Sequence, residues 1–134
     1  MKTGIVLIPM LATCLAVFVG CGDKDNDYRD TWLGMYEGYC EYYSSTGSDH
    51  QFDTVYTNQS LSVSKQGNEG LVLDYLYLGQ SFQVLCSSDG TFTSISNNPH
   101  SEWDGCFKGD SLFFNYYDVS QGHSSTRHFK GKKE

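Results

Sequence analysis

Proline and basic side chains are scarce in this chain. Its 134 residues include two prolines, and nine lysines and arginines stand against sixteen aspartates and glutamates, so the formal net charge is −7. Nucleic acid is therefore not an expected partner, because its phosphate backbone is bound mainly by basic side chains. Cys-x-x-Cys and Cys-x-x-His spacings are also missing, and the four histidines lie in polar, turn-like segments. We expect neither a metal site nor another cofactor.

Helical periodicity is missing as well. After residue 31, no run of ten or more residues carries a helical period with caps at its ends. Apolar side chains instead alternate with polar ones, as in a strand with one buried face. Short turns separate these runs at intervals of about 8 to 12 residues, which is typical of antiparallel sheets. The residues expected to face inward are Trp32, Tyr36, Cys40, Tyr42, Val55, Leu61, Val63, Phe82, Val84, Cys86, Leu112, Phe114, Tyr116 and Phe129.

Residues 31–134 are therefore expected to form a single all-β domain. An antiparallel meander that closes into a small barrel accounts for the pattern, and a β-sandwich is the alternative. In a closed barrel the last strand, which contains Phe129, would pair with the first strand and leave no open edge. A chain of this size can bury one core of modest size.

The N-terminus carries the longest apolar run. Lys2 is followed by an uncharged stretch over residues 5–19, the arrangement of a cleaved signal peptide. This stretch is too short to span a bilayer, which needs roughly 20 apolar residues. The segment Phe18-Val19-Gly20-Cys21 resembles the lipobox of bacterial lipoproteins, which implies that residues 1–20 are removed and that Cys21 is acylated. The alternative is a plain signal peptide with an incidental cysteine.

Residues 21–30 are expected to be a solvated tether between the lipid and the domain. The run Gly22-Asp23-Lys24-Asp25-Asn26-Asp27 has no apolar side chain to bury. An acidic tract directly after the cysteine resembles a surface-export signal of some Gram-negative lipoproteins. The resemblance implies an outer-membrane lipoprotein of the bacterial envelope, exposed at the cell surface. Cleavage removes one lysine and leaves eight basic against sixteen acidic side chains, a formal charge of −8.

Three cysteines, Cys40, Cys86 and Cys106, remain for the folded domain. An odd number allows at most one disulfide in an oxidising compartment, and Cys86 with Cys106 is the candidate pair. The alternative is that all three stay reduced and are buried as small apolar side chains.

The letters Gly-Asp-Ser-Leu at residues 109–112 resemble the motif that heads a family of serine esterases and lipases. In that family a downstream Asp-x-x-His supplies the general base, whereas here Asp118 and His123 have a different spacing. A serine without an oriented base is not activated. Because a Gly-Asp pair between two alternating runs is typical of a hairpin turn, we expect Ser111 to follow such a turn and not to be a nucleophile.

The domain resembles the small lipocalin-like β-barrels of Gram-negative surface lipoproteins. The residues that carry this resemblance are Trp32-x-Gly34-x-Tyr36-x-Gly38, Asp89-Gly90-Thr91-Phe92, Gly109-Asp110-Ser111-Leu112 and Phe129-x-Gly131-x-Lys133. These are turn and core residues, so the resemblance implies a fold more than an activity.

A lipid-anchored binding or accessory module is the first functional hypothesis. An eight-stranded barrel is wide enough for side chains or for one small ligand. An interior pocket for a small apolar ligand would be lined by Trp32, Tyr36, Tyr42, Phe82 and Phe114, although the same side chains could simply fill the core. A glycan or another envelope protein are further partners, and Tyr39 and Tyr43 on one strand face could stack on sugar rings.

An inhibitor of a host or competitor hydrolase is the alternative. It would act through a loop, for which Ser44–Asp53 and Ser96–Glu102 are the candidates, because binding residues gather on loops held by a rigid scaffold. We expect no enzymatic activity. Glu37 and Glu41 share a strand face, but a face open to water does not tune the pKa of a carboxyl group for acid–base catalysis.

Overall fold

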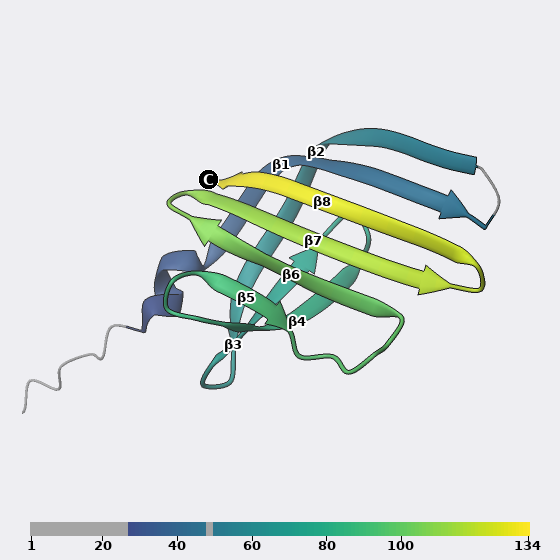
Figure 1. The fold of residues 1–134 in the computed structure, drawn as a ribbon. Coiled ribbons are helices and arrows are strands. Elements are labelled where there is room, and N and C mark those ends of the chain that lie inside the picture. The colour runs from purple at the N-terminus through teal and green to yellow at the C-terminus, as the bar shows by residue number, and fades with distance from the viewer. Residues whose placement is uncertain (1–26, 48–49) are drawn as a thin grey trace, which may run out of the picture.

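The computed structural model describes residues 27–47 and 50–134 (Figure 1). The proposed signal peptide, Cys21 and most of the proposed tether lie outside these residues. A short 3₁₀ helix, η1, precedes eight strands. Their bounds are η1 Tyr28–Trp32, β1 Gly34–Thr46, β2 His50–Gln66, β3 Gly70–Tyr75, β4 Gln80–Cys86, β5 Thr91–Ser94, β6 Ser101–Lys108, β7 Ser111–Ser120 and β8 His123–Lys133.

The eight strands form a closed antiparallel barrel in which each strand pairs with its neighbours in sequence and β8 pairs with β1. The predicted meander barrel is therefore confirmed, and the sandwich alternative is not observed. Closure depends on a close approach of β1 and β8 at Gly38, where a Cβ atom would overlap with the carbonyl oxygen of Lys130. A glycine at this position lets the two backbones meet.

The alternation read from the sequence places the core correctly on most strands. Inward positions of β4 and β7, such as Phe82, Val84, Leu112 and Phe114, are at most 4% exposed. Phe129 on β8 is 2% exposed. Side chains of alternate residues thus fill the barrel, and the residues between them face solvent.

The prediction for Val55 is wrong, because a β-bulge interrupts β2. The register of β1 and β2 shifts between Gly38 and Cys40, which pair with Gln59 and Tyr56, so that β2 has one residue more than β1 over this stretch. Asn58 adopts a positive φ of 54° at the bulge, a conformation that asparagine tolerates better than most residues. The extra residue reverses the alternation, and Val55 is therefore 57% exposed on the outer face.

One end of the barrel is closed by η1 and a cluster of aromatic rings. Trp32 stacks on Phe107 with ring centroids 5.0 Å apart, and Tyr36 donates a hydrogen bond from its hydroxyl to the Trp32 carbonyl oxygen at 3.0 Å. Phe92 lies 5.2 Å from Phe107. The C-terminal strand also ends here, since Lys133 pairs with Tyr36 (Figure 1). We call this region the closed end.

Residues 27–30 belong to the fold, which corrects the predicted extent of the tether. Asp27 caps η1 and accepts hydrogen bonds from the backbone and the guanidinium of Arg29. The Arg29 guanidinium also donates to the carbonyl oxygens of Gly67 and Gly70 in the β2–β3 turn, both at 3.0 Å. The Arg29 side chain has five N–H donors, and these hydrogen bonds compensate the burial of its charge, since the residue is only 6% exposed. The sequence suggested a tether because the run from Gly22 to Asp27 has no apolar side chain.

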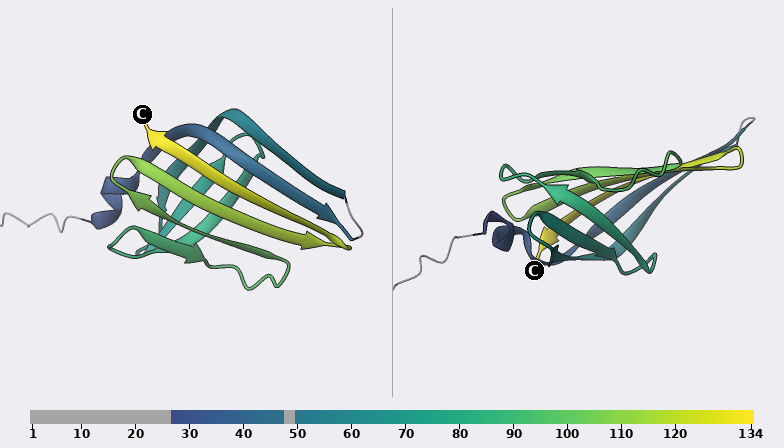
Figure 2. Two further views of the ribbon diagram at one scale, coloured as in Figure 1. Left: turned by 45° about the horizontal axis from the view of Figure 1, so that its top comes forward. Right: turned by 90° about the horizontal axis from the view of Figure 1, so that it is seen from below.

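At the other end, four strands continue past the barrel as a protruding sheet. We define it as residues 43–46 of β1, 50–57 of β2, 117–120 of β7 and 123–126 of β8. These segments pair with one another in the order β2-β1-β8-β7, whereas β3 pairs with β2 only between Leu61 and Gln66. Figure 2 shows the strand ends running on together beyond the barrel.

Candidate functional site

The interior of the barrel is occupied by its own side chains. Tyr36, Phe82 and Phe114 are at most 4% exposed, and the rings of Phe82 and Phe114 lie 4.9 Å apart. Burial raises the pKa of Tyr36 to about 12. Of the five residues predicted to line an interior pocket, these three therefore pack against other rings in the core.

The other two predicted pocket residues lie at opposite ends of the barrel. Trp32 reaches the core from η1 at the closed end and not from a strand. Tyr42 is half-buried where the protruding sheet begins, and its ring lies 4.6 Å from the guanidinium carbon of Arg127. The five residues therefore do not surround one space.

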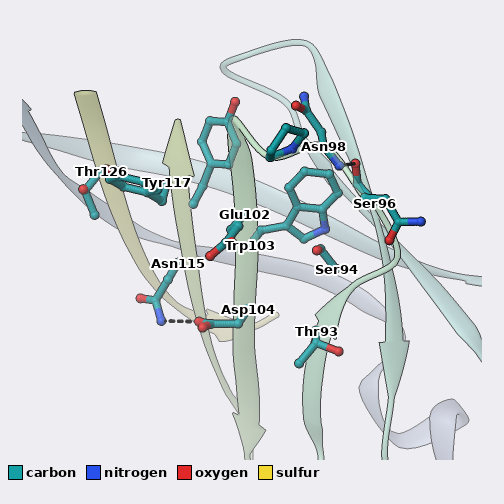
Figure 3. A pocket seen from close by; sticks show the side chains of 13 residues that line it. Thr93, Ser94, Ser96, Asn98, Glu102, Trp103, Asp104, Asn115, Tyr117 and Thr126 are labelled. Carbon is teal, nitrogen blue, oxygen red and sulfur yellow. Dashed lines mark hydrogen bonds between the residues drawn. The ribbon is translucent and has the colours of Figure 1, made fainter. Parts of the chain in front are cut away.

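An open groove lies instead on the outer face of the sheet, beside the segment that joins β5 to β6 (Figure 3). It has a volume of about 490 Å³. Its floor is formed by side chains of β6, β7 and β8, and one wall is formed by residues 96–99. A second hollow of about 250 Å³ lies on the same face over β1, β2 and β8. Thr126 lines both, so the two hollows are neighbours, and we call them together the outer groove.

Two rows of cross-strand neighbours build the outer groove. Pairing places each residue of a row directly opposite the next one on the adjacent strand, so that a row runs across the sheet. The first row is Glu102, Tyr117, Thr126, Tyr43 and Asp53. The second is Thr93, Asp104, Asn115, His128 and Glu41.

The first row holds two exposed tyrosines on either side of a small residue. Tyr43 and Tyr117 are 40% and 45% exposed, and each pairs with Thr126. Two steps between strands separate them by about 10 Å. Tyr43 donates a hydrogen bond to a Glu41 carboxylate oxygen at 3.3 Å, and the negative charge of Glu41 raises the pKa of Tyr43. Sequence reasoning had selected Tyr43 but missed Tyr117, whose partner across the sheet depends on register.

Three residues of the second row, Asp104, Asn115 and His128, are joined by side-chain hydrogen bonds. Asn115 donates from its Nδ2 atom to Asp104 at 2.7 Å (Figure 3). The Oδ1 atom of Asn115 lies 2.7 Å from His128 Nδ1. The ring of Tyr43 packs edge-on against that of His128, with the ring centroids 5.8 Å apart. These contacts hold the polar groups of Asp104 and Asn115 on the groove floor in fixed positions.

The remaining candidate residues lie away from the groove. Tyr39 shares the outer face of β1 with Tyr43, as predicted, and is 38% exposed. Ser111 follows the Gly109-Asp110 turn, where Gly109 has a φ of 60°, so the predicted hairpin is confirmed. The Ser111 hydroxyl donates to the adjacent Asp110 carboxylate at 3.0 Å.

The three cysteines of the domain are free thiols in the structure. Cys86 faces the core and is 6% exposed, whereas Cys106 precedes the inward-facing Phe107 and is half-buried on the outer face. The barrel wall therefore lies between the two thiols, and the candidate pair Cys86–Cys106 is not joined. Burial raises the pKa of Cys86 to about 11 and also raises the pKa of Cys40.

The two segments considered as inhibitory loops differ. Residues 95–100 connect β5 and β6 without strand pairing of their own, and Ser96 and Asn98 stabilise the turn by side-chain hydrogen bonds to backbone amides. Most of Ser44–Asp53, in contrast, belongs to β1 and β2, so this segment is not a loop. A run of serines and polar residues suggested a loop, but both strands find partners along it.

Residues 27–47 and 50–134 contain no cluster of three or more His, Cys, Asp or Glu side chains that could hold a metal ion. None of the helices described is long and apolar enough to cross a membrane. Comparisons with protein-family models, with curated proteins and with solved structures find no match for this chain.

Proposed function

We propose that this protein is a non-catalytic glycan-binding module, anchored to the bacterial outer membrane through acylated Cys21, and that the outer groove binds neutral saccharides. The observation that carries the proposal is the pair of exposed tyrosines, Tyr43 and Tyr117, on either side of Thr126 in a groove lined by carboxylate and amide groups. The filled interior supports it, because a ligand must then bind outside.

The two tyrosines offer what sugar rings require for stacking. One face of a pyranose carries C–H groups, which pack on the π-face of an aromatic ring. The separation of about 10 Å matches a disaccharide unit of an extended glycan, so that both rings can contact the same chain. The threonine between them leaves room for the intervening linkage.

Polar groups at the edges of the groove match the hydroxyl groups of a sugar. Glu102, Asp53 and Asp104 provide carboxylate acceptors, and Asn98 and Gln51 provide amides that both donate and accept. The carboxylates also select against acidic saccharides, since like charges repel. Neutral chains, or chains that carry amino groups, fit this surface.

The place where the N-terminal segment joins the barrel supports anchoring at the closed end. Asp27 caps η1, and η1 lies at the closed end, away from the protruding sheet (Figure 1). Five residues lie between Cys21 and Asp27, and the six steps from Cα to Cα span about 20 Å at most. An anchor at Cys21 would thus hold the closed end near the membrane and present the protruding sheet to the surroundings.

The test measures binding of the chain from Gly22 onward to neutral and acidic oligosaccharides by calorimetry. We expect neutral oligosaccharides to bind, and Tyr43→Ala and Tyr117→Ala each to weaken binding about tenfold or more, equal to about 1.4 kcal/mol. Tyr39→Ala is the matched control, because Tyr39 is equally exposed on the same face but outside the groove. Equal losses in all three variants would refute the assignment of the groove. Failure to bind any glycan would favour the inhibitor hypothesis, and an intact mass without acyl groups at Cys21 would refute the anchor.

A further inference from the structure

The outer edge of β2 is unpaired in the protruding sheet. β2 pairs with β1 along its length, but its pairing with β3 begins only at Leu61. The Ser60 carbonyl oxygen still accepts a hydrogen bond from the amide of Leu76 at 3.2 Å. Before Ser60, within the residues described, this edge pairs with no other strand, and Figure 1 shows β2 as the outermost strand of the sheet.

This edge has few of the features that protect exposed edges. Lysine, proline and inward-pointing charges usually prevent edge strands from pairing with other chains. Residues 51–57 contain no lysine and no proline, and Asp53 is their only charged residue. The edge is therefore competent to accept another strand.

Exposed apolar side chains gather beside the same edge. Val55 is 57% exposed on the outer face, and Leu76 and Tyr77, which begin the β3–β4 turn, are 56% and 62% exposed. The ring of Tyr77 lies 5.5 Å from that of Tyr56, which places the turn next to β2. Because Tyr56 faces inward, Val55 and Tyr77 lie on opposite faces, and exposed apolar side chains flank the free edge on both sides of the sheet.

We propose that this edge pairs with the same edge of a second copy of the chain, in antiparallel orientation about a two-fold axis at Val55. The free stretch runs from residue 50 to residue 60, and its midpoint is Val55. A two-fold axis there brings Val55 opposite Val55 of the second copy and Asp53 opposite Thr57, so the two Asp53 carboxylates do not face each other. The edge is thus complementary to itself, as an isologous interface requires.

The Asn58 bulge limits the length of this pairing, and the two-fold arrangement limits the assembly to two copies. A bulge disrupts the regular ladder, so pairing extends over residues 53–57. Each copy has used its free β2 edge once the two strands are joined, and no further copy can add there. Repulsion between two acidic domains is screened at physiological salt, where the Debye length is about 8 Å. Because an interface of this length is small, association depends on concentration.

The occupant is a second copy and not an unrelated peptide because the exposed Val55 at the midpoint of the edge meets its own symmetry mate, and the single carboxylate of Asp53 meets a threonine. The inference is independent of the ligand of the outer groove. It also predicts that both outer grooves face the same side of the dimer, since an axis perpendicular to the sheet keeps equivalent faces together.

Sedimentation velocity of the chain from Gly22 onward, which contains every residue of the described barrel, tests the association from micromolar to millimolar concentration. We expect a monomer–dimer equilibrium. Val55→Lys places two ammonium groups against each other at the axis and should weaken dimerisation at least tenfold. Leu85→Lys is the control, because Leu85 is 48% exposed on β4, away from this edge.

Cross-linking locates the axis. In a Cys106→Ser background, Val55→Cys should form a disulfide between copies, because residues opposite each other in antiparallel strands have Cα atoms within the range that a disulfide bridges. Leu85→Cys should not. A monomer at every concentration, a dimer unaffected by Val55→Lys, or equal cross-linking at both positions would overturn the proposal. A chain that stays monomeric but pairs this edge with a strand of another protein would also overturn it.

Discussion

The closed end and the protruding sheet are built largely from the same strands, yet they differ in almost every property. At the closed end β7 buries Leu112 and Phe114, and β8 buries Phe129. Further along, the same two strands carry Tyr117, Ser120 and Ser124, which are exposed or half-buried. The register of β7 and β8 is continuous between the two regions, so along these two strands the difference is one of side chains and not of backbone pairing.

The difference shows how one sheet can separate stability from recognition. Aromatic rings of η1, β5 and β6 pack against one another at the closed end, where burial of apolar surface stabilises the fold. In the protruding sheet the strands are held mainly by backbone hydrogen bonds, and most of the side chains described are exposed or half-buried. Substitutions in the two regions should therefore have unequal effects on the free energy of unfolding.

The largest effect is expected at the closed end. Phe107→Ala removes a ring that is 2% exposed and contacts Trp32, Tyr36 and Phe92. It should lower the free energy of unfolding by about 3 to 5 kcal/mol, as measured in urea. A loss of less than 1 kcal/mol would show that the aromatic cluster does not stabilise the barrel.

A smaller effect is expected where the two regions meet. Tyr75 donates a hydrogen bond from its hydroxyl to Gln59 Oε1 at 3.0 Å, in a buried position beside the β2 bulge. Tyr75→Phe leaves the Gln59 oxygen without this donor and should cost about 1 to 3 kcal/mol. Tyr117→Phe removes an exposed hydroxyl and serves as the control. If both variants unfold at the same urea concentration, the buried hydrogen bond does not contribute to the free energy of unfolding.

The ion pair between Asp27 and Arg29 should make the stability of the protein sensitive to acid. The side-chain hydrogen bond from Arg29, supported by Lys65, lowers the pKa of Asp27. A carboxyl group whose pKa is lower in the folded state stabilises the protein above the unfolded pKa, near 3.9, and loses this contribution as the pH falls further. The midpoint temperature of thermal unfolding should therefore fall more steeply below about pH 4 in the wild type than in Asp27→Asn. Equal falls in the midpoint temperature of the two proteins would show that this ion pair does not stabilise the fold.

The smallest effect is expected in the protruding sheet. Tyr43→Ala and Tyr117→Ala each truncate a side chain that is at least 40% exposed. Each should change the free energy of unfolding by no more than about 0.5 kcal/mol, because both side chains are exposed and the hydrogen bond from Tyr43 to Glu41 is open to water. Urea unfolding measures this directly. A large loss of stability would mean that the tyrosines of the outer groove are structural.

Strand alternation allowed most of the barrel to be predicted from sequence. The inward faces of β4 and β7 and the turn at Gly109-Asp110 follow from local patterns alone. The reversal at Val55 could not be predicted, because a bulge is decided by pairing with a strand elsewhere in the chain. The docking of Arg29 was missed for a similar reason, since its acceptors are carbonyl groups of a distant turn.

The candidate site was less predictable than the fold. Tyr43 could be selected as an exposed aromatic on one strand. Its relation to Tyr117 and Thr126 depends on the register of three strands, two of which, β1 and β8, are joined only by barrel closure. The rings expected to surround an interior pocket pack against one another, because the composition of a face does not reveal whether space remains inside it.

The bulge at Asn58 also gives β2 a built-in phase shift. One inserted residue means that every position before it is read in the opposite frame of inside and outside. A regular strand that kept all of these residues would exchange the two sets, turning Asp53 and Val55 toward the inner face and Thr54 and Tyr56 toward the outer one. The chemistry of the recognition surface on this strand is therefore encoded as much in the one extra residue of the bulge as in the identity of its side chains.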